Sequence, residues 1–101
     1  MIELRPGVRL RSTVCTTEVV VVRSAAVELR CGGLPMVLVG DSPPASPGLD
    51  LAHAAGTQLG KRYADPASGL EVLCTKGGEG SLALGEAPLL RKDAKPLPSS
   101  D

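Results

Sequence analysis

The chain repeats itself. Residues 7–37 and 60–90 align without a gap at a constant offset of 53 positions. Seven of the 31 aligned pairs are identical, whereas roughly two or three identities are expected by chance from such a composition. The identical pairs are Gly7/Gly60, Arg9/Arg62, Glu18/Glu71, Val19/Val72, Leu29/Leu82, Gly32/Gly85 and Pro35/Pro88. The sequence therefore predicts one small module that is written twice.

Within each copy the local pattern is that of short β-strands. In the first copy, residues 8–11 alternate apolar and charged side chains, residues 18–23 form a β-branched run typical of a largely buried strand, and residues 27–30 alternate again. The glycines after Cys31 predict a tight turn before a last strand at 36–39. The second copy predicts strands at 61–63, 70–75 and 81–84 and a short run at 88–90. We expect 81–84 to pair back on 70–75 across the glycine-rich hairpin turn 76–80.

These segments divide the chain into a first repeat at 1–39, a linker at 40–59, a second repeat at 60–90 and an extended tail at 91–101. The linker is rich in Pro and Ser and could include a short helix at 49–55. The chain has no Phe or Trp and one Tyr, so its core must be built from small apolar side chains. A 31-residue module of this kind is too small to be stable alone. We therefore expect an all-β fold in which the two copies pack on each other.

Composition argues against several classes of partner. The formal net charge is zero and aromatic residues are nearly absent, so the stripe of Arg5, Arg9 and Arg11 does not predict nucleic-acid binding. No apolar segment approaches the length of a membrane span or of a signal peptide, and the expected location is the cytoplasm. Three cysteines are an odd number, which argues against a complete disulfide framework.

The chain resembles desulforedoxin and the N-terminal iron-binding domain of desulfoferrodoxin, which are rubredoxin-like. The resemblance lies in the order of elements: a strand, a turn that carries metal ligands (a knuckle), a hairpin, a second knuckle and a strand. In that family a Cys-x-x-Cys-Gly turn precedes a valine-rich strand and a glycine-rich hairpin, and a Cys-Cys-Gly turn follows. Here residues 10–16 fall on the first knuckle and 29–36 on the second, while the second copy keeps the spacing at 63–69 and 75–81. Family members pair as two-fold dimers. The resemblance therefore implies two desulforedoxin-like β-ribbon repeats packed as a pseudo-two-fold pair within one chain.

The resemblance also identifies the former ligand positions, because the family holds one iron in four thiolates. Ser12, Cys15, Cys31 and Gly32 occupy these positions in the first copy, and Asp65, Ser68, Leu84 and Gly85 occupy them in the second. A four-thiolate iron centre within one chain is excluded, because there are three cysteines. If the resemblance holds, the sulfurs of Cys15 and Cys31 should lie within about 4–6 Å of each other.

Four interpretations of Cys15 and Cys31 remain open. They could be reduced thiols left from a lost site, a disulfide, or a catalytic redox pair. They could also hold zinc or iron, with Ser12, His53, Cys74 or a second chain completing the site, since two thiolates alone hold zinc weakly. Cys74 falls in a buried strand and is expected to be a core residue. His53 falls in the linker and is expected to be solvated.

Two functions follow as hypotheses. The first is a small non-catalytic accessory or interaction protein without a cofactor, which has lost the four-cysteine iron site and binds a protein partner or a second copy of itself. The alternative is a metal-binding or thiol-redox protein that uses Cys15 and Cys31, with the site completed across a dimer or by a partner. An enzymatic activity of the chain by itself is not expected, although it could be a small subunit of a larger enzyme.

Overall fold

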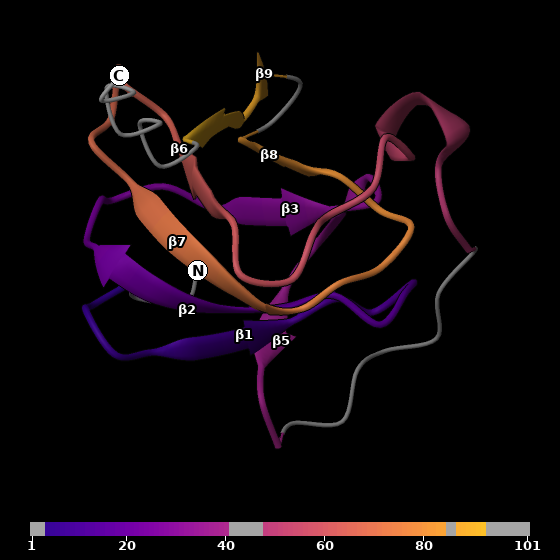
Figure 1. The fold of residues 1–101 in the computed structure, drawn as a ribbon, viewed down its shortest axis with the longest axis horizontal. Coiled ribbons are helices and arrows are strands. Elements are labelled where there is room, and N and C mark those ends of the chain that lie inside the picture. The colour runs from indigo at the N-terminus through magenta and orange to yellow at the C-terminus, as the bar shows by residue number, and fades with distance from the viewer. Residues whose placement is uncertain (1–3, 41–47, 85–86, 93–101) are drawn as a thin grey trace, which may run out of the picture.

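The chain folds as two antiparallel β-sheets, which confirms the predicted all-β class (Figure 1). The computed structural model describes residues 4–40, 48–84 and 87–92. One sheet has six strands in the order β10-β6-β7-β2-β1-β5, and the other has four in the order β4-β3-β8-β9. The strands are β1 Arg9–Arg11, β2 Glu18–Arg23, β3 Leu29–Cys31, β4 Leu34–Pro35, β5 Val37–Leu38, β6 Arg62–Ala64, β7 Glu71–Lys76, β8 Leu82–Leu84, β9 Ala87–Pro88 and β10 Leu90–Lys92.

The strands recur at the same offset as the sequence. Each of β1 to β5 begins 53 residues before its counterpart among β6 to β10. Backbone hydrogen bonds recur as well: Ser12 N donates to Thr17 O at 2.8 Å, and Asp65 N donates to Leu70 O at 2.9 Å. Corresponding segments of the two halves therefore have the same local structure, although most of their side chains differ.

The two halves are joined by strand pairing. β2 pairs with β7 in the six-stranded sheet, and β3 pairs with β8 in the four-stranded sheet. The predicted pairing of 81–84 back on 70–75 is wrong, because β8 pairs with β3 and β9 while β7 pairs with β2 and β6. The glycine-rich segment after β7 thus leads from one sheet to the other. A strand from the opposite half supplies the apolar partners instead, as in the facing pairs Val21↔Val72 and Leu29↔Leu84.

One core cluster lies between the inner faces of the two sheets. Alternate residues of a strand point to opposite faces, so Val19 and Val21 of β2 are buried while Val22 is 38% exposed. Residues 18–23 are therefore half-buried, and not largely buried as predicted. The buried apolar residues are Leu4, Leu10, Val19, Val21, Leu29, Cys31, Met36, Tyr63, Leu70, Val72, Cys74, Leu82, Ala83 and Leu89.

The segment between the halves contains the one helical element of the described residues, a 3-10 turn at Leu51–His53 within the predicted 49–55. Asp50 caps this turn, accepting a hydrogen bond from Ala52 N at 3.0 Å. Residues 41–47 of the predicted linker and residues 93–101 of the predicted tail lie outside the described residues. The first two residues assigned to the tail, Arg91 and Lys92, belong to strand β10. In the described ranges no helix has the length and hydropathy needed to cross a membrane.

Candidate functional site

Cys15, in a loop of the six-stranded sheet, meets Cys31, in a strand of the four-stranded sheet. Cys15 lies in the loop 12–17 that joins β1 to β2, and Cys31 is the last residue of β3. Their sulfurs are 3.9 Å apart, just below the predicted range, and both residues are free thiols. The turn predicted after Cys31 is present, with Gly32 and Gly33 at φ 67° and 93°. We call Ser12, Cys15, Thr17, Cys31 and Gly80 the cysteine site.

Ser12 shapes the loop that carries Cys15. Its buried hydroxyl oxygen accepts hydrogen bonds from Val14 N at 3.1 Å and from Cys15 N at 3.2 Å. A serine side chain that accepts from N–H groups two and three residues ahead stabilises a tight turn. Ser12 therefore fixes the direction in which Cys15 leaves the backbone.

The equivalent loop of the second half, residues 65–70, keeps this arrangement without any thiol. Asp65 Oδ2 accepts a hydrogen bond from Ser68 N at 3.1 Å, as Ser12 does from Cys15 N. Ser68 Oγ then accepts from Leu70 N at 3.3 Å. Oxygen acceptors are thus sufficient to hold the shape of this loop.

Hydrogen-bonding groups surround the Cys15 sulfur. Its thiol donates to Thr17 Oγ1 at 3.2 Å, and Gly80 N donates to the sulfur at 3.4 Å. Burial by itself raises the pKa of Cys15, but hydrogen bonds from the Ser12 and Thr17 hydroxyls and from the Thr17 and Gly80 N–H groups outweigh it. Together they lower the pKa to about 7 from an ordinary 9.0. A large fraction of Cys15 is therefore thiolate near neutral pH.

Cys31 has the opposite environment. Its residue is fully buried, whereas Cys15 is half-buried. Burial, followed by the charge of Cys15, raises the pKa of Cys31 to about 12. The pair thus combines one accessible thiolate with one buried neutral thiol, which is an arrangement suited to stepwise thiol chemistry.

The second half of the chain covers the cysteines of the first half. A Cβ built on Gly78 would lie 3.0 Å from the Cys15 sulfur, and one built on Gly80 would lie 3.1 Å from both sulfurs. Thr16 Oγ1 donates to Gly77 O at 2.7 Å and ties the covering segment to the loop. Glycine is therefore required at 78, where a Cβ would also lie 2.7 Å from Thr17 N, and a larger residue at 80 would force its neighbours to shift. The sequence indicated only a hairpin turn at these positions.

The other two candidate residues lie apart from this pair. Cys74 is 1% exposed, and its thiol donates to Lys76 O at 3.1 Å, so its predicted role as a core residue is confirmed. Burial raises the pKa of Cys74. His53 is half-buried in the 3-10 turn, and not solvated as predicted; its carbonyl oxygen accepts a hydrogen bond from Ser81 N at 2.8 Å.

The first copy does not offer the donor set of a four-thiolate iron centre. Ser12 Oγ already accepts two backbone hydrogen bonds, and Gly32 has no side chain to donate. In residues 4–40, 48–84 and 87–92 no three His, Cys, Asp or Glu side chains gather to hold a metal ion. Iron in the manner of the family therefore does not fit the residues present.

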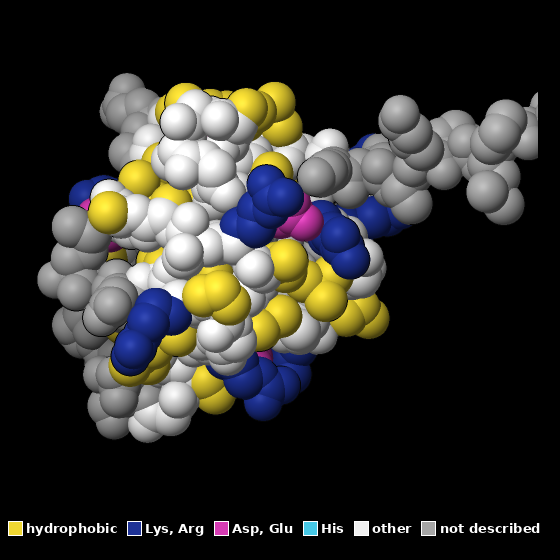
Figure 2. Space-filling view, turned by 90° about the vertical axis from the view of Figure 1, so that its left-hand side faces the viewer, with side chains coloured by type: hydrophobic (Ala, Val, Ile, Leu, Met, Phe, Trp, Pro, Cys, Tyr) yellow, Lys and Arg dark blue, Asp and Glu magenta, His cyan; other side chains and the backbone are white. Residues whose placement is uncertain are grey.

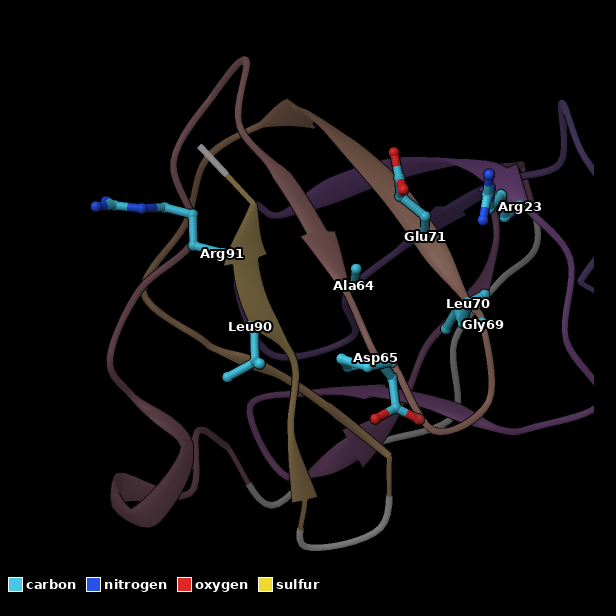
Figure 3. A pocket seen from close by; sticks show the side chains of 9 residues that line it. Arg23, Ala64, Asp65, Gly69, Leu70, Glu71, Leu90 and Arg91 are labelled. Carbon is cyan, nitrogen blue, oxygen red and sulfur yellow. The ribbon is translucent and has the colours of Figure 1, made fainter. Parts of the chain in front are cut away.

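A pocket of about 410 Å³ lies over the second half, at one end of β6, β7 and β10 (Figure 3). Three of its charged side chains have structural partners: Asp65 caps the loop 65–70, Glu71 pairs with Arg62 at 3.5 Å, and Arg91 donates to Gln58 Oε1 at 2.8 Å. Figure 3 shows Arg91 directed away from the other labelled side chains. Figure 2 shows the basic side chains of one face in several separate groups, some of them beside an acidic side chain. Neither this pocket nor these basic side chains bring reactive groups together as the cysteine site does.

No protein-family model, curated protein or solved structure matches this chain. The chemistry of the site must therefore be inferred from its own residues. Sequence reasoning identified Cys15 and Cys31 but not Thr17 or Gly80. The position of Thr17 two residues after Cys15 was the available signal for the first, and no local signal marked the second.

Proposed function

We propose that the chain is a small thiol-redox protein in which Cys15 and Cys31 alternate between two thiols and one disulfide. The observation that carries this proposal is the sulfur separation of 3.9 Å. A disulfide needs about 2.0 Å, so the sulfurs must approach by roughly 2 Å. Cys15 lies in a loop, and rotation of its side chain toward Cys31 can supply much of that approach. The pKa of Cys15 is about 7, whereas that of Cys31 is about 12. Because the thiolate is the attacking form, Cys15 is the attacking residue.

The test is oxidation of the full chain with diamide, followed by thiol counting and peptide mapping. We expect an intramolecular Cys15–Cys31 disulfide that dithiothreitol reverses, with Cys74 still reduced. Cys74→Ser is the matched control and should behave as the wild type. Disulfides between chains, or bonds that include Cys74, would contradict the proposal.

For the architecture, we propose two desulforedoxin-like copies related by a pseudo-two-fold axis. Two pairings support it. Val20 faces Leu73 in the β2–β7 pair and Arg30 faces Ala83 in the β3–β8 pair, and in each case the two residues are 53 positions apart. An antiparallel pair in which a residue faces its own equivalent is what a two-fold axis through that point requires.

A second candidate function is a non-catalytic accessory or interaction protein that has exchanged the iron site for packing between its copies. Leu84, at the position equivalent to Cys31, packs against the core cluster and favours this reading. Leu51, Leu59 and Leu90 are 86%, 68% and 60% exposed and could contact a protein partner or a second copy. A cytoplasmic location, and the absence of nucleic-acid and membrane partners, remain part of this proposal.

Metal analysis separates both candidates from a zinc or iron protein that shares its site across a dimer. We expect less than about 0.1 metal per chain and a melting temperature unchanged by chelation, because a structural zinc contributes roughly 10–16 kcal/mol to folding. One metal per two chains, lost together with dimerisation on chelation, would establish the shared site instead. Unchanged behaviour of Cys15→Ser under oxidising conditions would favour the accessory protein over the redox protein.

A further inference from the structure

We propose that hydroperoxides are the oxidant for this site, with Cys15 as the sulfur that attacks the peroxide and Cys31 as the thiol that resolves the product. This inference rests on the thiol-redox function above and adds to it the chemical class of the substrate.

Accessibility assigns the first step to Cys15. Cys15 is half-buried and reachable from solvent, whereas Cys31 is fully buried at the end of β3. A reagent from solvent therefore meets the Cys15 sulfur first. Cys31 lies behind it, with its sulfur 3.9 Å away.

The cover over Cys15 selects a small oxidant. The segment with Gly78 and Gly80 approaches so closely that a Cβ at either position would lie 3.0–3.1 Å from the Cys15 sulfur. Even one added carbon would be too close there, so this segment crowds the sulfur and restricts what can reach it. A hydroperoxide presents a single oxygen atom to the sulfur, whereas attack on the disulfide of a peptide or protein needs a much larger approach.

Two polar hydrogens can reach the sulfur once Cys15 is a thiolate. The Thr17 hydroxyl lies 3.2 Å from the Cys15 sulfur, and the N–H of Gly80 points at it from 3.4 Å. Both can bond to a peroxide oxygen that approaches the sulfur, and so both stabilise charge that develops on the departing oxygen. Thr17 is fully buried, so its hydroxyl is held in place and forms no hydrogen bonds with bulk water.

The chemical steps balance as follows. The Cys15 thiolate attacks the terminal peroxide oxygen, the O–O bond breaks, and the departing oxygen takes up a proton to become water or an alcohol. Cys15 is then a sulfenic acid. The Cys31 sulfur attacks the Cys15 sulfur, its proton joins the departing hydroxyl as water, and the disulfide forms. The peroxide gains two electrons and the two thiols lose two.

The test uses hydrogen peroxide on the reduced full chain, with dimedone as the trap for sulfenic acid. Wild type should lose two thiols and form the Cys15–Cys31 disulfide. Cys31→Ser should accumulate dimedone on Cys15, and Cys15→Ser should show neither product. Because Cys31 is in the core, Cys31→Ala is prepared as well, and wild-type samples quenched early provide the same trap without any substitution.

Thr17 supplies a finer readout. Thr17→Val has nearly the same shape and should slow peroxide oxidation about fivefold, the loss expected for one neutral hydrogen bond. Diamide oxidation should change less, and Thr17→Ser should restore the peroxide rate. A role for Thr17 that is only structural, or that acts only through the pKa of Cys15, would slow both oxidants alike.

The outcomes distinguish this inference from the function on which it rests. If diamide forms the Cys15–Cys31 disulfide but peroxide reacts no faster with the folded chain than with the chain in urea, the peroxide inference fails and the redox function stands. If neither reagent forms that disulfide, both fail. Faster oxidation by glutathione disulfide than by peroxide would also overturn the inference.

Discussion

Loops 12–17 and 65–70 occupy equivalent places in the two halves, each between the first two strands of its copy. The first residue of each loop supplies a side-chain acceptor for the backbone N–H three residues later, Ser12 in the first loop and Asp65 in the second. The residue three positions later differs: it is Cys15, facing another thiol, in the first loop and Ser68 in the second. The loop shape is thus independent of the thiol chemistry, and only the first half retains two sulfurs at a reactive distance.

The comparison also locates what makes Cys15 unusual. Part of its environment comes from its own loop, through Ser12 and Thr17, and part from the opposite half, through Gly80. A single copy would supply the loop but not the covering segment. The site therefore depends on the contact between the halves, and four experiments can examine how the halves differ.

The largest effect is expected in the core. Leu29 and Leu82 are identical residues at equivalent positions, and both are 2% exposed. Leu29→Ala and Leu82→Ala should each lower the free energy of unfolding by about 3 kcal/mol, because each removes buried methyl groups and leaves a cavity. Urea unfolding measures both, and costs that differ by more than about 1.5 kcal/mol would show that the halves are not equivalent in their contribution to stability.

Alkylation of Cys15 should depend on pH with a midpoint near 7, compared with 9.0 for an ordinary cysteine. Because its folded pKa is lowered, the thiolate persists above pH 7, and the iodoacetamide rate should fall about tenfold for each pH unit below it. The associated stability is present at alkaline pH and is lost as the pH falls through about 7. Cys74→Ser provides a matched control, and a midpoint at 9 in the folded chain would contradict the assignment.

The two loop acceptors should have similar structural but different chemical effects. Ser12→Ala and Asp65→Ala should each cost about 1 kcal/mol, since each removes a side-chain acceptor of backbone N–H groups. The Ser12 hydroxyl also lowers the pKa of Cys15, so only Ser12→Ala should raise the midpoint of alkylation. Thermal unfolding measures the first effect and the pH profile measures the second; a raised midpoint in Asp65→Ala would break the comparison.

The smallest effect concerns Glu18 and Glu71, which are identical residues at equivalent positions of the two halves. Glu18 pairs with Lys76 at 3.2 Å and Glu71 pairs with Arg62 at 3.5 Å, but their side chains are 23% and 6% exposed, respectively. Lys76→Ala should change stability by less than about 0.5 kcal/mol, because exposed ion pairs are screened. Glu71→Gln should cost more than Glu18→Gln, since its charge is more deeply buried. Equal costs in thermal melts would remove this difference between the halves.

Local pattern predicted the strand positions well. The expected strands at 8–11, 18–23 and 61–63 correspond within one residue at each end to β1, β2 and β6, because alternation and β-branched runs act over neighbouring residues. The predicted hairpin between 70–75 and 81–84 is wrong, because the turn residues specify that the chain bends but not which strand it then meets. The expected distance between Cys15 and Cys31 came from the proposed desulforedoxin-like arrangement, and not from any spacing in the sequence.

The sequence by itself determined the doubled plan, the approximate positions of most longer strands, and which side chains could carry chemistry, but not the short strand β4 or the full extent of β10. Only the tertiary structure decided that β2 meets β7 and β3 meets β8, that Gly80 lies on the two sulfurs, and that their pKa values move in opposite directions. The physical reason is the distance along the chain over which each effect acts. Backbone sterics and alternation are set by adjacent residues, whereas burial and hydrogen bonding at a sulfur depend on groups such as Gly80 N, 65 positions away along the chain.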